Sequence, residues 1–254
     1  MDIPPSHPRY KSLMIRERLV EGFRRGLVVP EGLIAHGRGE AFDYILGEES
    51  HDFALEAERA TVARLLLAES PVISVNGNYA ALAAEEIAEL ARLTGARVEV
   101  NLFYRTEERV RAIHKYLEGY GVPNLLSPDC EKTHVPGLES ARGIVCRDGI
   151  ARADFVLLAI EDGDRTEALK SWGKIVSAID LNPFSRTAQR ADITIVDEAI
   201  RATRNMVRIA RGLRGSPRSE LEGIVAGYDN RLVLSKAFKA MLERLATASS
   251  KGVL

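Results

Sequence analysis

Apolar residues recur with helical spacing in the first part of the chain. Between residues 12 and 26, Ile15, Leu19 and Phe23 lie four positions apart, and Gly26 follows as a candidate C-terminal cap. This spacing predicts an amphipathic helix. A second helix is expected after HGRG, through EAFDYILGE, and a third over about residues 52–68. Residues 1–70 are therefore expected to form an N-terminal helical part.

From residue 71 onward, short apolar runs alternate with helical patterns. Strands are expected in VISV (72–75), VEVNLF (98–103), residues 143–147, FVLLAI (155–160), KIVSAI (174–179) and ITIV (193–196). Helices are expected over about residues 79–93, over residues 105–118, and briefly after residue 164. Uninterrupted apolar strands are typical of sheets buried on both faces. The pattern therefore predicts an α/β fold with a parallel sheet flanked by helices, over residues 71–200.

The remaining segments complete one expected domain over residues 1–254. Residues 201–254 return to helical spacing, and this tail is expected to pack on its own domain or on a second subunit. Residues 123–142 contain three prolines and are expected to form an irregular surface loop or a flap.

Composition narrows the class of partner. The net charge is −1 and 46% of residues are apolar, which argues against nucleic acid or an anionic membrane and favours small-molecule chemistry. Cys130 and Cys146 are too few and too unpatterned for a disulfide framework or a zinc site, so a reducing compartment is expected. The N-terminus lacks an apolar signal region, and no apolar run approaches the ~18 residues of a membrane span. A cytoplasmic protein is expected.

Two groups of polar residues follow the first two expected strands. Ligands of parallel sheets bind beyond the carboxyl ends of strands, where helix N-termini attract anions. Asn76, Gly77 and Asn78 could bind such a ligand at the start of a helix, although an Asn-Gly turn is often only structural. Arg105 and Arg109 are four residues apart and are expected on one helix face; the alternative is a solvated, charge-balanced helix.

A cluster of acids follows FVLLAI. Glu161, Asp162 and Asp164 surround Gly163, and carboxylates this close repel one another unless a cation, an arginine or helix-capping N–H groups hold them. Mg²⁺ is one candidate. An N-cap formed by Asp164 would explain a single carboxylate and leave the other two unexplained.

The last two strands are followed by a mixture of donors and acceptors. Asp180 follows KIVSAI, where an acid can accept from ribose hydroxyls or capture a backbone turn. The Ser-Arg-Thr step at 185–187 supplies donors that suit phosphate, and the segment 197–199 follows ITIV at another helix start. Adjacent strand ends are thus expected to form one polar crevice that suits a nucleotide.

The segment GLIAHGRGEAFDY holds part of a dinucleotide-binding motif. Gly37 and Gly39 match two of its glycines, but Phe42 stands where the third belongs, which argues against NAD. The segment is instead expected to be a flexible glycine turn that carries His36 and Arg38 to a helix N-terminus, where they could bind a phosphate or carboxylate. The alternative for His36 is a purely structural role.

Long blocks of the sequence resemble the archaeal phosphopantothenate synthetase family, also called the 4-phosphopantoate–β-alanine ligase family. These blocks include IPPSHPRYKSL, GLIAHGRGEAFDYILGE, VISVNGNYAAL, VEVNLFYRTEERVRAI, IEDGDRTEALKSWGK, AIDLNPFSRTAQRADITIVDEAIRA and DNRLVLSKAF. The resemblance runs almost from end to end and is weakest over about residues 120–150 and the last ten residues.

The resemblance implies a dimeric, Rossmann-like, ATP-dependent ligase on the archaeal route to coenzyme A. Such an enzyme joins 4-phosphopantoate to β-alanine and gives 4'-phosphopantothenate, AMP and diphosphate. By resemblance, ATP would contact Arg16, Arg38, Asp180, Leu181, Asn182, Arg186, Thr187, Glu198 and Ala199. Among these, Arg16 rests on the resemblance alone.

The implied chemistry suggests roles for the other candidates. Release of AMP implies an acyl-adenylate, for which arginines and Mg²⁺ would steady the polyphosphate. The residues expected to hold phosphopantoate are Asn76, Gly77, Asn78, Arg105 and Arg109. The base that frees the β-alanine amine could be His36, Glu161 or Asp162. Two alternatives bind a phosphate without ligation: a nucleotide- or sugar-phosphate-binding protein, and a phosphosugar isomerase.

Overall fold

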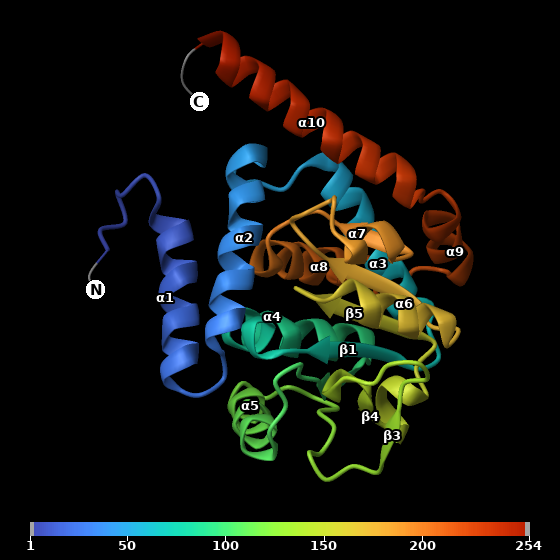
Figure 1. The fold of residues 1–254 in the computed structure, drawn as a ribbon. Coiled ribbons are helices and arrows are strands. Elements are labelled where there is room, and N and C mark those ends of the chain that lie inside the picture. Colours follow the sequence, from blue (N-terminus) through green and yellow to red (C-terminus); the bar gives the residue numbers. More distant parts are fainter. Residues whose placement is uncertain (1–2, 252–254) are drawn as a thin grey trace.

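A five-stranded parallel sheet forms the centre of the molecule (Figure 1). The computed structural model describes residues 3–251. The strand order is β2-β1-β5-β6-β7, with all four neighbouring pairs parallel. The strands are β1 (Pro71–Val75), β2 (Arg97–Val100), β5 (Phe155–Ala159), β6 (Ile175–Ile179) and β7 (Ile193–Ile195). The predicted α/β, Rossmann-like architecture is confirmed.

Each face of the sheet packs in its own hydrophobic core, which explains the uninterrupted apolar strands. Along β5, Phe155, Leu157 and Ala159 belong to the larger core, whereas Val156 and Leu158 belong to the smaller one. Successive residues of a strand point to opposite faces, so a strand buried on both sides is apolar at most positions. Buried exceptions such as Ser74 and Ser177 are hydrogen-bonded to other side chains.

Helices from distant parts of the chain cover the two faces. The larger core includes residues of α3 (Asp52–Leu67), α4 (Gly77–Thr94), α5 (Glu107–Gly119) and α8 (Ala199–Leu213). The smaller core includes residues of α6 (Gly163–Ser171). The short α7 (Arg186–Arg190) packs against α6 near the ends of β6 and β7. The helices α3, α4, α5, α6 and α8 match the expected segments to within a few residues, whereas no helix was expected at α7.

Two further helices, α1 (Tyr10–Arg24) and α2 (Pro30–Leu46), come before α3 in the chain. The prediction that HGRG forms a turn is wrong, because α2 runs unbroken through Gly37 and Gly39. The helix begins instead at Pro30, a residue whose fixed φ and missing N–H suit the first helical position. His36 and Arg38 are therefore presented from the middle of a helix.

The C-terminal segment is helical as expected. It contains α9 (Arg218–Ala226) and α10 (Asn230–Lys251) after α8. Helix α10 packs on α2, α3 and β7 of the same chain, and Figure 1 shows its C-terminal end extending away from the other elements. On the second half of α10, the apolar side chains of Leu242 and Leu245 are 67% and 52% exposed.

Residues 123–142 are more ordered than expected. They include β3 (Lys132–His134), which pairs antiparallel with β4 (Ile144–Cys146), and the short 3₁₀ helix η1 (Ala141–Gly143). The strand expected at 143–147 is present, but it belongs to this two-stranded sheet and not to the parallel one. We call residues 127–147 the excursion.

A disulfide closes the excursion, contrary to the expectation drawn from the cysteine count. Cys130 and Cys146 are bonded, with Cα atoms 5.7 Å apart. The antiparallel register places Lys132 opposite Cys146 and so brings Cys130, two residues earlier, within bonding range. Cysteine usage therefore does not support a reducing compartment. Within residues 3–251, no helix has the length and apolar character needed to cross a membrane.

Candidate active site

Two cavities adjoin at the carboxyl ends of the strands. The first, of about 310 Å³, lies beyond β5, β6 and β7 and is bounded by α2. The second, of about 490 Å³, lies beside the start of α4 and the loop after β2. Both are lined by one set of residues, which we call the shared wall: Ala35, Arg38, Ile160, Asp162, Gly163 and Arg186.

Most of the predicted site residues line these cavities. Those in the first cavity are His36, Arg38, Glu161, Asp162, Asp180, Leu181, Asn182, Arg186, Thr187, Glu198 and Ala199. Those that line the second, apart from the shared wall, are Asn76, Gly77, Asn78 and Arg109. Segments far apart in the sequence thus converge at one edge of the sheet, as parallel strands require.

Arg16 and Arg105 lie outside both cavities. The Arg16 guanidinium donates to the Glu40 carboxylate from Nε (3.0 Å) and from Nη2 (2.9 Å). Arg105 precedes α5, whose N-cap is Thr106, so the expected helix face shared with Arg109 is not formed. Its side chain instead lines a separate small pocket, of about 10 Å³, beneath the excursion.

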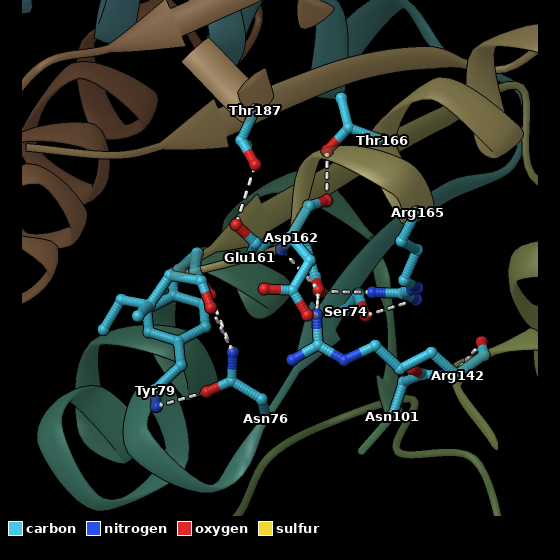
Figure 2. A network of polar contacts seen from close by, with 12 residues as sticks. Ser74, Asn76, Tyr79, Asn101, Arg142, Glu161, Asp162, Arg165, Thr166 and Thr187 are labelled. Atoms are coloured by element: carbon cyan, nitrogen blue, oxygen red, sulfur yellow. Dashed lines mark hydrogen bonds and ion pairs between the residues drawn. The ribbon is translucent and has the colours of Figure 1, made fainter. Parts of the chain in front are cut away.

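Side chains at the start of α4 are bound to the protein itself. Asn76 caps the helix by accepting from the Tyr79 N–H (3.0 Å), as Figure 2 shows. Its amide also donates to the carbonyl oxygens of Ala159 (2.7 Å) and Ile160 (3.2 Å). The Asn78 amide donates to the Gly32 carbonyl (2.7 Å). What this segment offers a ligand is the positive end of α4 and its first N–H groups.

The Arg109 side chain is also bound to the protein itself. Its Nε and Nη2 donate to the carbonyl oxygen of Leu27 (3.1 and 2.9 Å), and its Nη1 donates to that of Tyr104 (2.8 Å). A side chain added at Gly77 would collide with the same Leu27 carbonyl. Arg109, on α5, therefore ties the loop before α2 to the loop after β2 at the rim of the second cavity.

Two arginines hold the acid cluster. Glu161 is ion-paired with Arg142 and with the fully buried Arg165, which also donates to Ser74 (3.1 Å; Figure 2). Arg142 lies 3.1 Å from the carboxylate of Asp162, whose side chain is 52% exposed. The sequence allowed a cation, an arginine or helix-capping N–H groups to stabilise these carboxylates, and the structure shows that arginines do so.

Neither arginine was identified from the sequence. Arg165, in the first turn of α6, follows Glu161 by four residues, a separation that could have indicated the pair, although Glu161 itself precedes the helix. Arg142 comes from the excursion, and only the tertiary fold brings it to the acids. Asp162, not Asp164, is the N-cap residue of α6. Within residues 3–251, no three His, Cys, Asp or Glu side chains are grouped as metal ligands.

Ile160, in the shared wall, has a strained backbone. Its φ is +52°, a left-handed conformation that a β-branched residue rarely adopts and that costs about 1–3 kcal/mol. The conformation is held because the Ile160 N–H donates to Ile179 (3.1 Å) while its carbonyl accepts from Asn76. No sequence pattern indicated this strain.

Asp180 organises the loop after β6. Its carboxylate accepts from the N–H of Asn182 (2.9 Å) and from the hydroxyl of Ser185, which itself caps α7. Burial raises the pKa of Asp180 to about 6. Of the two roles expected for Asp180, binding ribose hydroxyls or holding a backbone turn, the structure shows the second.

Buried acids also lie behind the end of β7. Glu198 caps α8 by accepting from the Arg201 N–H (2.9 Å), and burial raises its pKa to about 6. Asp197 is bound by Ser50 (2.5 Å) and by Arg201 (2.6 Å). Behind it, burial and the nearby Asp197 raise the pKa of Glu58 well above its ordinary value.

His36 is the one imidazole that lines these two cavities. Burial in the wall of the first cavity lowers its pKa below the usual 6.5. The ring is therefore largely neutral at pH 7 and can accept a proton.

Comparison with known proteins identifies the family. Residues 53–244 match the family described as phosphopantothenate/pantothenate synthetase. A protein of Thermococcus kodakarensis named 4-phosphopantoate--beta-alanine ligase is 51% identical over 253 residues, covering 100% of this chain and 97% of its own. A Methanosarcina mazei protein of the same name is 48% identical, covering 98% of both chains. With relatives of this similarity over its full length, the chain belongs to the phosphopantothenate/pantothenate synthetase family.

Proposed function

We propose that the protein is an ATP-dependent ligase of coenzyme A biosynthesis. It condenses (R)-4-phosphopantoate with β-alanine to 4'-phosphopantothenate and releases AMP and diphosphate. The curated relatives carry the name of this ligase. The observation that carries the proposal is the pair of cavities meeting at one wall, because a ligase must bring two substrates into contact.

The first cavity is assigned to ATP. It combines the start of α8 at Glu198–Ala199, the turn at Asp180–Asn182, and the arginines of the shared wall. Helix N-termini and guanidinium groups both stabilise phosphate oxygens. Arg16, which is paired with Glu40 outside this cavity, is proposed as an ATP contact on the family resemblance alone.

The second cavity is assigned to phosphopantoate. The start of α4, at Asn76–Asn78, and Arg109 lie at its rim. These residues shape the cavity through their bonds to Gly32, Leu27 and the end of β5, so they act mainly by positioning. Arg105 lies beneath the excursion and is retained only as an indirect contributor.

Catalysis then consists of two displacements at the shared wall. A carboxylate oxygen of phosphopantoate forms a bond to the α-phosphorus as the bond to diphosphate breaks. The β-alanine nitrogen next bonds to the acyl carbon as the bond to AMP breaks, and the ammonium proton passes to a base. His36 is suited to accept it because burial keeps the ring neutral, Asp162 is a second candidate, and Glu161 positions the two arginines.

Mg²⁺ is expected to accompany the phosphates of ATP. The described residues do not by themselves make a site for it, since the acids of the first cavity are bound to arginines or to backbone turns. The proposal therefore assigns no residue to the metal.

The proposal includes a homodimer in the cytoplasm. The apolar side chains on the second half of α10 would gain burial against another copy. The use of ATP in coenzyme A synthesis supports the cytoplasmic location. The disulfide is compatible with that compartment in hyperthermophilic archaea, whose intracellular proteins are disulfide-rich.

Incubation with ATP, Mg²⁺, phosphopantoate and β-alanine tests the function. The ligase produces AMP in an amount equal to 4'-phosphopantothenate, and only when both acids are present. A nucleotide- or sugar-phosphate-binding protein yields no AMP, and a phosphosugar isomerase acts without ATP. Formation of ADP in place of AMP would contradict the adenylate route while sparing the ligase class.

A further inference from the structure

We propose that Arg142 of the excursion binds the carboxylate of phosphopantoate at the shared wall. This inference rests on the proposed ligase function and extends it to a residue outside the strand-end motifs. Arg142 is 8% exposed and lines the second cavity. Figure 2 shows its guanidinium between the acids Glu161 and Asp162 on one side and Asn76 on the other.

The position of Arg142 is fixed from several directions. Asn101, at the end of β2, donates to the carbonyl oxygens of Arg142 (3.2 Å) and Ile144 (3.1 Å). The guanidinium carbon lies 5.3 Å from the centre of the Phe103 ring, which provides a cation–π contact. Anchored backbone and stacked guanidinium together prepare the group to meet an anion.

The two arginines of the shared wall, Arg38 and Arg186, are assigned to ATP, so a carboxylate placed against the wall needs a further cation. For its carboxylate to reach the α-phosphate in the first cavity, phosphopantoate must place that end against the wall. Asp162, whose half-exposed side chain lines both cavities, would repel it at this point. Arg165 cannot compensate, because it is fully buried and bound to Glu161 and Ser74. Arg142 lines the cavity and lies 3.1 Å from Asp162, so it is placed to neutralise the approach.

Arg142 also has donor capacity to spare. Its Nε is buried and has no hydrogen-bond partner within residues 3–251. Arg109, in the same cavity, differs because its Nε, Nη1 and Nη2 all donate to backbone carbonyls. Burial lowers the pKa of Arg142 even though Glu161 and Asp162 lie beside it. A ligand carboxylate would add a further acceptor for the guanidinium.

Binding of three compounds to the wild type and to Arg142→Gln separates the two ends of the ligand. The compounds are phosphopantoate, its amide lacking the carboxylate charge, and pantoate lacking the phosphate. We expect the wild type to prefer phosphopantoate over the amide by about 10- to 100-fold. In Arg142→Gln this preference falls to within about twofold. The preference for phosphopantoate over pantoate stays unchanged.

Two further variants guard against a folding defect. Arg142→Lys keeps the charge beside Glu161 and is expected to fold and to retain an acid-over-amide preference about 3- to 10-fold below the wild-type value. Arg147→Gln removes an exposed arginine of the same excursion that is paired with Glu131 and lines neither cavity, and it is expected to match the wild type.

The outcomes distinguish this inference from the ligase function. An unchanged acid-over-amide preference in both Arg142 variants would overturn the inference. The proposed ligase function would still hold if the wild type forms AMP and 4'-phosphopantothenate. Collapse of the phosphate preference instead would place Arg142 at the other end of the ligand and would also overturn it. A wild type that binds no phosphopantoate and forms no AMP overturns both.

Discussion

The side-chain amide of Asn76, at the end of β1, donates a 2.7 Å hydrogen bond to the carbonyl oxygen of Ala159, at the end of β5. The same side chain caps α4, so one residue fixes two adjacent strand ends and a helix start. The shared wall begins at the next residue, Ile160. The geometry of the site thus depends on a side chain that is bound to the protein itself.

Replacing Asn76 tests this dependence. Asn76→Ser keeps an oxygen that can cap α4 but removes both donors to the end of β5. We expect the free energy of unfolding in urea to fall by about 1–3 kcal/mol, because buried carbonyl oxygens lose their partners. The control Thr106→Ser keeps the cap of α5, outside both cavities, and should stay within about 0.5 kcal/mol of wild type. Equal stability of the two variants would contradict the structural role.

Arg186 and Arg190 form a matched pair for nucleotide binding. Both are ion-paired with Glu167, at 2.7 and 2.8 Å, but only Arg186 lines the cavities. Arg186→Ala should weaken ATP binding about tenfold or more in calorimetric titration, whereas Arg190→Ala should leave it unchanged. The two variants should unfold alike. Unchanged ATP affinity in Arg186→Ala would remove the residue from the site.

Glycines of the site differ in their tolerance of a methyl group. Gly77→Ala forces a Cβ against the carbonyl of Leu27, and we expect a loss of about 2–4 kcal/mol in unfolding free energy. Gly37→Ala places its Cβ in open space within α2, so it should stabilise the protein by about 0.5–1 kcal/mol. The reverse order in thermal unfolding would contradict the helical path of α2.

The buried Glu58 predicts a pH dependence of stability. Its pKa is raised from 4.5 to about 9, mainly by burial and secondarily by Asp197. The folded protein therefore holds this proton more tightly than the unfolded chain. Its contribution is fully present below about pH 4.5 and is lost as the pH rises towards about 9. Glu58→Gln should flatten the decline in unfolding free energy over that range.

The control for this measurement is Glu56→Gln, which changes an acid of the same helix that is paired on the surface with Lys236. It should keep the wild-type slope. A slope in Glu58→Gln identical to that of wild type would show that Glu58 does not titrate between the two limits.

The elements that local patterns predict well are those decided by burial. FVLLAI and KIVSAI contain β5 and β6, whose mostly apolar side chains fill both cores. The clusters after β5, β6 and β7 converged because parallel strands end at one edge. Apolar runs and the polar clusters that follow them recur along the chain, so both can be recognised directly in the sequence.

The errors arose where distant contacts outweighed local preference. HGRG contains two helix-weakening glycines, yet α2 continues through it because flanking residues such as Phe42 and Ile45 pack on the larger core. The disulfide and Arg142 both depend on how the excursion folds back on the sheet. The prediction that Arg105 shares a helix face with Arg109 was wrong because Thr106 caps α5, which begins only at Glu107. Nothing in these segments encodes such contacts locally.

Transfer of an isotopic label tests the central claim that two cavities meet so that one substrate attacks the other. Phosphopantoate labelled with ¹⁸O in its carboxylate is incubated with ATP, Mg²⁺ and β-alanine, and the AMP is examined by mass spectrometry. Attack on the α-phosphate across the shared wall predicts one ¹⁸O atom in each AMP. Unlabelled AMP, or label in inorganic phosphate together with ADP, would contradict it.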